Sequence, residues 1–103
     1  MENASLSFLK PWVQSDPQPA EAFLRELQLE LSPAHPLHGT KLAAIAHSRA
    51  ADDVLFQMED GRVAQVHLTW SGHTEQPPWP NHDVYGSIQE WAQQVMIPAH
   101  EDY

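Results

Sequence analysis

Histidine offers the widest range of chemistry in this sequence, which contains seven histidines and no cysteine. The spacing around a predicted β-hairpin places one of them, His67, directly opposite Asp53. A carboxylate beside an imidazole fixes the orientation of the ring, which is half of a general-base arrangement. The same cross-strand pair can instead do no more than help set the register of the hairpin. The structural role is favoured, because catalysis also needs a nucleophile or a substrate pocket and the sequence shows neither.

The other hydroxyl and carboxylate groups match no catalytic motif. Ser71 is near His67 in the sequence but lacks the G-x-S-x-G surroundings of a nucleophile elbow. Asp52 and Asp53 are adjacent, so in a strand their side chains point to opposite faces, which disfavours glycosidase chemistry. The sequence also has no glycine-rich phosphate-binding loop. A non-enzymatic protein without a cofactor is therefore the favoured prediction.

The histidine spacing does not favour a metal centre. A zinc site needs three or four converging ligands. The only closely spaced pair is His35 and His38, on a proline-interrupted segment with no second pair at zinc-finger spacing. We expect no metal site, and an effect of stoichiometric zinc on melting that depends on His67 and His73 would argue otherwise.

Four tryptophans form the second group of candidate functional residues. Helical spacing places Trp91 in the core, and alternation with Leu68 places Trp70 there as well. Trp12 and Trp79 are flanked by prolines, so each either packs over a core edge or serves as an interface anchor, a role in which tryptophan is enriched. The candidate binding residues are Trp79 and Trp12, together with His73 on the long loop and Gln65 on the polar face of the hairpin.

The β-hairpin that positions His67 spans residues 52–70, with a turn at Glu59, Asp60 and Gly61. A three-residue loop, in which a type I turn precedes Gly61 in the left-handed conformation, pairs Phe56 with Ala64 and Asp53 with His67. Only this register gathers the oily side chains on one face: Val54, Phe56, Met58, Ala64, Val66, Leu68 and Trp70. The opposite, largely polar face then carries Asp53, Leu55, Gln57, Val63, Gln65, His67 and Thr69.

Two helices flank the predicted strands. Apolar residues at helical spacing predict a first helix over residues 16–31, with prolines tolerated in its first turn. Ser87 and Glu90 form a capping-box pattern at the start of a second helix, expected from Ile88 to Met96 and stopped by Pro98. Residues 41–48 are predicted to be a strand, although their three alanines leave a helix open.

These elements predict a single α+β domain over residues 1–103, in the order α-β-β-β-α. An antiparallel sheet of about three strands would have both helices packed on its oily face. Residues 1–15 would form an apolar N-terminal arm. Residues 71–83 would form a long proline- and tryptophan-containing loop, and a loop of that length is often functional.

Charge and composition narrow the classes of partner. Fourteen acidic and five basic residues give a formal net charge of −9. The scattered lysines and arginines argue against a nucleic-acid partner, whereas the acidity would suit a basic protein partner. The absence of cysteine, of a signal-peptide pattern and of a long apolar run predicts a cytoplasmic protein that does not bind a membrane.

Several short motifs give the chain a resemblance to a known family. DDVLF, the DG turn, VHLTW, PPWP and a YxSxxEW pattern at residues 85–91 follow one another within residues 37–96. In this order they resemble a family of short uncharacterised bacterial proteins. The resemblance implies a bacterial cytosolic origin and supplies no mechanism.

The sequence thus predicts a non-enzymatic protein-binding domain, comparable to an immunity or adaptor protein, with Trp79 and the polar face as contact regions. The alternative is a small enzyme or ligand-binding domain that uses His67, Asp53 and the 71–83 loop. A third possibility is a homodimer through the sheet, because Leu55 and Val63 would leave its polar face partly apolar.

Overall fold

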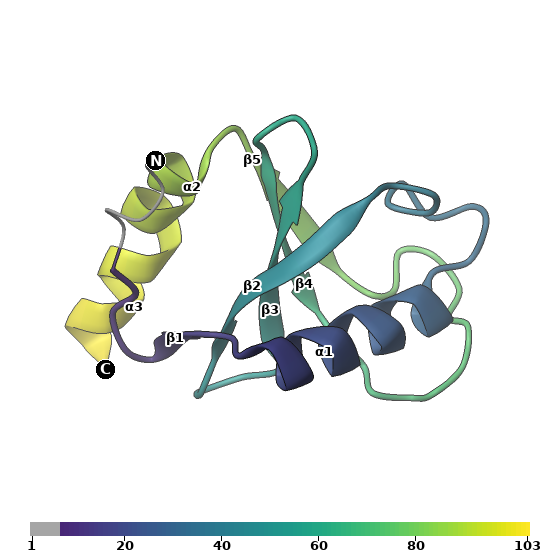
Figure 1. The fold of residues 1–103 in the computed structure, drawn as a ribbon, viewed down its shortest axis with the longest axis horizontal. Helices are drawn as coiled ribbons and strands as arrows, with labels where there is room; N and C mark the ends of the chain where they lie inside the picture. The colour runs from purple at the N-terminus through teal and green to yellow at the C-terminus, as the bar shows by residue number, and fades with distance from the viewer. Residues whose placement is uncertain (1–6) are drawn as a thin grey trace.

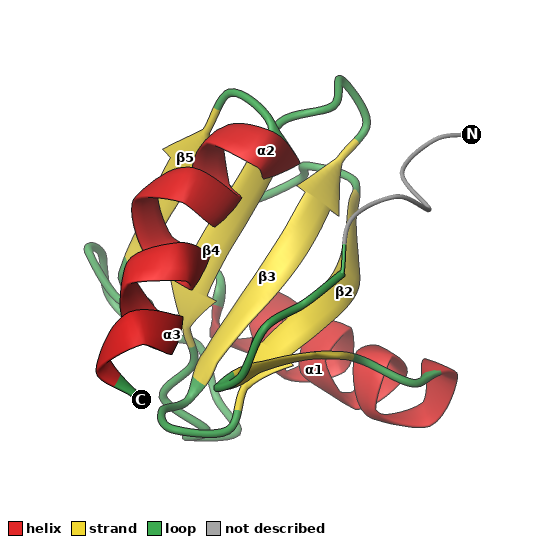
Figure 2. Ribbon diagram, turned by 90° about the vertical axis from the view of Figure 1, so that its left-hand side faces the viewer, coloured by secondary structure: helices red, strands yellow, loops and turns green. Residues whose placement is uncertain are grey.

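The computed structural model describes residues 7–103 and contains a five-stranded antiparallel sheet with helices on both faces (Figures 1 and 2). The strands follow one another across the sheet in chain order, from β1 to β5. Their bounds are β1 Trp12–Gln14, β2 Leu42–Ser48, β3 Asp53–Met58, β4 Val63–His67 and β5 His82–Tyr85. The helical segments are α1 Pro17–Glu30, α2 Ile88–Trp91, the π-helical turn η2 Ala92–Met96, and α3 Ile97–Asp102.

The α+β class is confirmed, but the predicted three strands are too few. β2, β3 and β4 lie where the sequence predicts strands. The two edge strands were missed because one lies within the expected N-terminal arm and the other begins at the end of the expected long loop. Both are short, at three and four residues, and short edge strands carry little periodicity to detect.

The register of the β3–β4 hairpin is confirmed. Val54 pairs with Val66, Phe56 with Ala64 and Asp53 with His67. The amide of Met58 donates to the carbonyl of Arg62 at 2.9 Å, and Gly61 has a φ of 93°, as a three-residue loop requires. The hairpin therefore places its oily residues on the face covered by α1.

α1 covers that first face. Its prolines lie in the first turn, where the missing amide hydrogens have no intrahelical role, and Asp16 precedes the helix without a side-chain capping bond. The core beneath it contains Leu27, Leu31, Leu37, Leu42, Val54, Phe56, Met58, Ala64, Val66 and Leu68.

The C-terminal helical segment covers the opposite face, which corrects the prediction that both helices share one face (Figure 2). The face expected to be largely polar holds a second core, made of Trp12, Ala46, Leu55, Val63, Trp91, Ala92 and Met96. Leu55 and Val63 are fully buried there. They do not form the exposed apolar patch on which the homodimer prediction was based.

The C-terminal segment continues past Pro98 to Asp102, where the sequence predicts an end before the proline. The reason is the wide turn η2, in which the amide of Ile97 donates to the carbonyl of Ala92, five residues back. Proline in an ordinary helix clashes with the carbonyl four residues back, and a wide turn displaces that carbonyl. At the start of the segment, the Ser87 hydroxyl accepts from the amide of Glu90 at 3.1 Å, as the capping pattern predicts.

None of the helices within residues 7–103 combines the length and the apolar content that crossing a lipid bilayer requires.

Candidate functional site

The predicted His67–Asp53 pair exists and belongs to a row of polar side chains across the sheet. Asp53 Oδ1 accepts a hydrogen bond from His67 Nδ1 at 2.7 Å. Asp53 Oδ2 accepts from Gln65 Nε2 at 3.3 Å, and Gln65 Oε1 accepts from the buried indole of Trp91 at 2.8 Å. The row therefore connects the second core to the surface, with His67 at its open end.

The geometry of this row favours a structural role. Gln65 and Asp53 are both occupied by bonds to neighbouring side chains, and the bond to Gln65 satisfies the only polar atom of the Trp91 ring. The side chain of His67 is 52% exposed on the sheet. Gln65, predicted as a binding residue, is in this structure the hydrogen-bond partner that a buried tryptophan requires.

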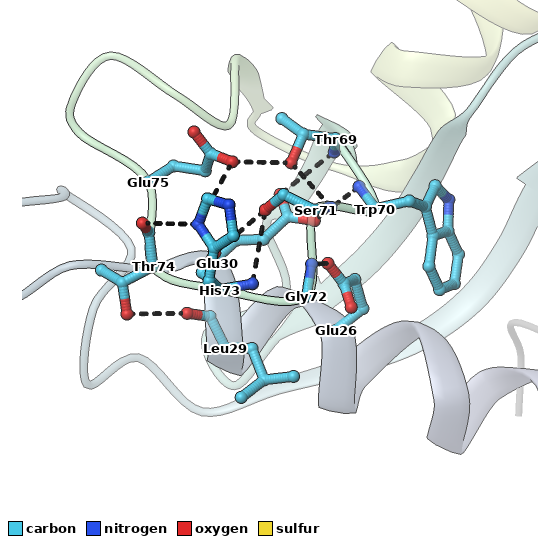
Figure 3. A network of polar contacts seen from close by, with 10 residues as sticks. All are labelled: Glu26, Leu29, Glu30, Thr69, Trp70, Ser71, Gly72, His73, Thr74 and Glu75. Carbon is cyan, nitrogen blue, oxygen red and sulfur yellow. Dashed lines mark hydrogen bonds and ion pairs between the residues drawn. The ribbon is translucent and has the colours of Figure 1, made fainter.

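A second polar cluster fixes the long loop between β4 and β5 onto α1 (Figure 3). Glu30, in the last turn of α1, is fully buried. One of its oxygens accepts from the amide of Thr69 at 3.1 Å and the other from the amide of Trp70 at 2.9 Å. One helical turn earlier, Glu26 accepts from the amide of Gly72 at 3.0 Å. The two glutamates thus accept hydrogen bonds from three backbone amides of the loop, those of Thr69, Trp70 and Gly72.

Further bonds extend this attachment along the loop. The Thr74 hydroxyl donates to the carbonyl of Leu29 at 3.1 Å, and the amide of Glu75 donates to the carbonyl of Glu30 at 2.9 Å. These carbonyls lie at the C-terminal end of α1, where the last carbonyls of a helix lack intrahelical partners. The first half of the loop therefore completes the end of α1.

Burial, together with a hydrogen bond with Glu26, raises the pKa of the Glu30 carboxyl to about 7, against the opposing effect of the hydrogen bonds from Thr69 and Trp70. Two carboxyl groups that share a site favour keeping one proton between them. The attachment of the loop is therefore sensitive to pH near neutrality.

The second half of the loop is fixed by a buried histidine. His35 is 3% exposed; its Nδ1 accepts from the amide of Leu37 at 3.0 Å, so Nε2 carries the proton and donates to the carbonyl of Pro80 at 2.9 Å. The ring of His82 lies against it, with centroids 4.8 Å apart. Burial lowers the pKa of His82, as does the neighbouring His35, while Asp83 opposes this shift.

The loop presents two indoles to solvent. Trp70 is 46% exposed and Trp79 is 47% exposed. The exposure of Trp79 leaves it available as an interface anchor. Trp12, in contrast, is 3% exposed and packs edge-on against Trp91 with ring centroids 4.9 Å apart, so it is a packing residue.

The exposure of Trp70 corrects its predicted place in the core. β4 ends at His67, and the amide of Leu68 donates to the carbonyl of Asp52. Trp70 then adopts a φ of 58°, the left-handed conformation, with its amide held by Glu30. The alternation of a strand therefore ends before Trp70, and its indole turns away from the core.

The remaining predicted residue, His73, is exposed on the loop, with its Nδ1 3.2 Å from the carbonyl of Thr74 and 3.9 Å from a carboxylate oxygen of Glu75. Within residues 7–103, no three histidine, aspartate or glutamate side chains converge as metal ligands would.

Sequence reasoning missed Glu26, Glu30 and His35. A signal for the two glutamates was present: they lie four residues apart on α1, with no lysine or arginine three or four positions from either one. Like charges at this spacing destabilise an isolated helix, so partners elsewhere in the chain were to be expected. The proline-rich surroundings of His35 gave no comparable signal.

Comparison of the chain with protein-family models, with curated proteins and with solved structures finds no match.

Proposed function

We propose that this protein is a non-enzymatic protein-binding domain, of the immunity or adaptor type, that binds a basic protein partner through the loop of residues 68–81. The proposal includes the bacterial cytoplasmic setting that the motif resemblance implies. The observation that carries it is a loop with two half-exposed indoles, whose first half is bonded to α1 and whose second half is bonded to His35.

The loop combines two properties of a binding surface. Tryptophan is among the residues that dominate binding energy at protein interfaces. A loop that is ordered before binding also loses less conformational entropy on association. Here, Glu26 and Glu30 supply that order, while Trp70 and Trp79 supply exposed aromatic surface.

The charge pattern supports a basic partner. Residues 63–103 contain no lysine or arginine, while Glu75, Asp83 and Glu90 lie within them. Complementary charge raises the rate of association and selects partners, and it does so less at high salt.

Affinity capture from the organism that encodes the chain tests this proposal, with the wild type and the Trp79→Ala variant as baits. Ile97→Ala is a matched control, because Ile97 is a comparably exposed apolar residue on α3. We expect a basic protein to be captured by the wild type and the control. Its measured affinity for Trp79→Ala should fall by about thirtyfold, as loss of a hot spot worth about 2 kcal/mol implies. Capture of nothing by the wild type would contradict the proposal.

A second candidate function is a ligand-binding or enzymatic role for His67 and Asp53 together with the 71–83 loop. The specific observation in its favour is the 2.7 Å bond that orients a half-exposed imidazole. A thermal-shift screen against small metabolites distinguishes the two, because a ligand bound to the native state raises its stability. Stabilisation that disappears in His67→Ala but persists in Trp79→Ala would favour this second function.

A further inference from the structure

A small hollow lies between α1, the β2–β3 turn and the start of the long loop. Its volume is about 170 Å³, below the roughly 300 Å³ at which small-molecule pockets begin, so it suits a single side chain. Its lining includes Phe23, His47, Asp52 and Trp70. Aromatic rings and carboxylate-bearing residues therefore lie around one opening.

The aromatic part of the lining is a connected set of rings. The centroid of Phe23 lies 6.0 Å from that of Trp70, at an interplanar angle of 64°, and 5.1 Å from that of His47. The half-exposed Trp70 indole leaves ring surface open to a ligand. A cation over the face of an indole is attracted by the ring quadrupole, and tryptophan is the best of the aromatic residues in this respect.

The position of Trp70 is fixed by bonds outside the hollow. Its amide donates to Glu30 at 2.9 Å, and its left-handed φ of 58° is uncommon for a bulky residue. Such conformations persist only when the surroundings hold them, and they concentrate at ligand sites. The indole is therefore presented in a defined orientation before any ligand arrives.

One carboxylate at the hollow is available to a cation. Asp52 is exposed, whereas the carboxylate of Asp53 is engaged by His67 and Gln65. Burial lowers the pKa of His47, as does the nearby Arg49, whereas Asp16 opposes this shift. The lowered pKa favours an uncharged ring. Arg49 itself does not line the hollow.

We infer that this hollow receives an arginine side chain of the partner. A planar guanidinium stacks on an indole and pairs with a carboxylate at the same time, which a lysine ammonium does less well. This inference rests on the proposed function, since it names the group on a basic protein that the loop surface recognises.

Titration of the protein with N-acetyl-arginine amide, followed through the indole N–H resonances, tests the inference. We expect the Trp70 signal to shift. N-acetyl-citrulline amide, which has nearly the same shape without the charge, should bind about two- to thirtyfold more weakly, the range that a cation–π contact spans. Asp52→Asn should weaken binding severalfold, and Trp70→Ala should abolish it. Trp79→Ala is the matched control, because its indole is equally exposed and does not line the hollow.

The outcomes separate this inference from the proposed function. Equal binding of arginine and citrulline, or no shift at Trp70, would overturn the inference even if a partner is captured. Equal binding of N-acetyl-lysine amide would also overturn the choice of arginine. If the arginine probe binds as expected while the wild-type bait captures no protein, the hollow is a guanidinium site and the proposed function fails.

Discussion

The backbone amide of Trp70 donates a hydrogen bond to Glu30 Oε2 at 2.9 Å, although the two residues are 40 positions apart in the sequence. The bond joins the end of α1 to the first turn of the long loop (Figure 3). Through it, a fully buried carboxylate determines where a half-exposed indole lies.

Replacing Glu30 should release this loop and destabilise the fold. Glu30→Ala leaves the amides of Thr69 and Trp70 without their acceptor, and an orphaned donor costs about 1–3 kcal/mol. Urea denaturation should show this loss in the free energy of unfolding. Glu21→Ala, an exposed glutamate on the same helix, is the control and should change it by less than about 0.5 kcal/mol. Equal midpoints for the two variants would contradict the role of Glu30.

The elevated pKa of Glu30, about 7 in the folded protein against 4.5 as the ordinary value, predicts a pH dependence. Between these values the folded state binds more protons than the unfolded state. The contribution of Glu30 to stability is therefore fully present below pH 4.5 and is lost as pH rises through 7. In Glu30→Gln this contribution is absent, so the stability of the wild type relative to the variant should fall between pH 4.5 and 7.5.

Two histidines act in the opposite direction in the same pH range. The pKa values of His47 and His82 are lowered by burial, so the stability that they contribute is present above pH 6.5 and is lost as pH falls. Both are retained in Glu30→Gln, and the difference between wild type and variant removes their effect. Parallel stability profiles for the two proteins would show that Glu30 does not titrate in this range.

The hairpin could be predicted in detail because its information is local. One register follows from the loop length, the glycine at position 61 and the alternation of side chains. In that register the apolar residues of β3 and β4 lie on the same face. The long loop could not be predicted in this way. Its order depends on Glu26, Glu30 and His35, which are far from it in the sequence. No local pattern in residues 68–81 carries that information.

The burial of the second face of the sheet could not be predicted for a related reason. Leu55 and Val63 were correctly placed on one face, but the polar residues beside them suggested a face open to solvent. The structure buries both under Trp91 and satisfies the polar atom of that indole through Gln65. A face of mixed polarity is therefore compatible with burial when each polar group has a partner.

Phe56→Ala tests the face assigned to the hairpin. Phe56 is fully buried beneath α1, so the substitution removes a large apolar side chain and leaves a cavity. We expect a loss of about 3–5 kcal/mol in the free energy of unfolding. Val84→Ala, at a 40% exposed position on β5, is a control that should cost about 1 kcal/mol or less. Melting of Phe56→Ala at the wild-type temperature would contradict the assignment.

Within the polar row of Trp91, Gln65, Asp53 and His67, we expect Gln65 to contribute more to stability than His67, which lies at the exposed end. Gln65→Ala removes the acceptor of the buried Trp91 indole and should cost about 1–3 kcal/mol. His67→Ala removes only the hydrogen bond of a half-exposed imidazole to Asp53 and should cost less than about 1 kcal/mol. Urea denaturation of the two variants measures this difference. If His67→Ala were the more destabilising, the row would depend on the His67–Asp53 bond for its order. The bond between Gln65 and Trp91 would then be secondary to it.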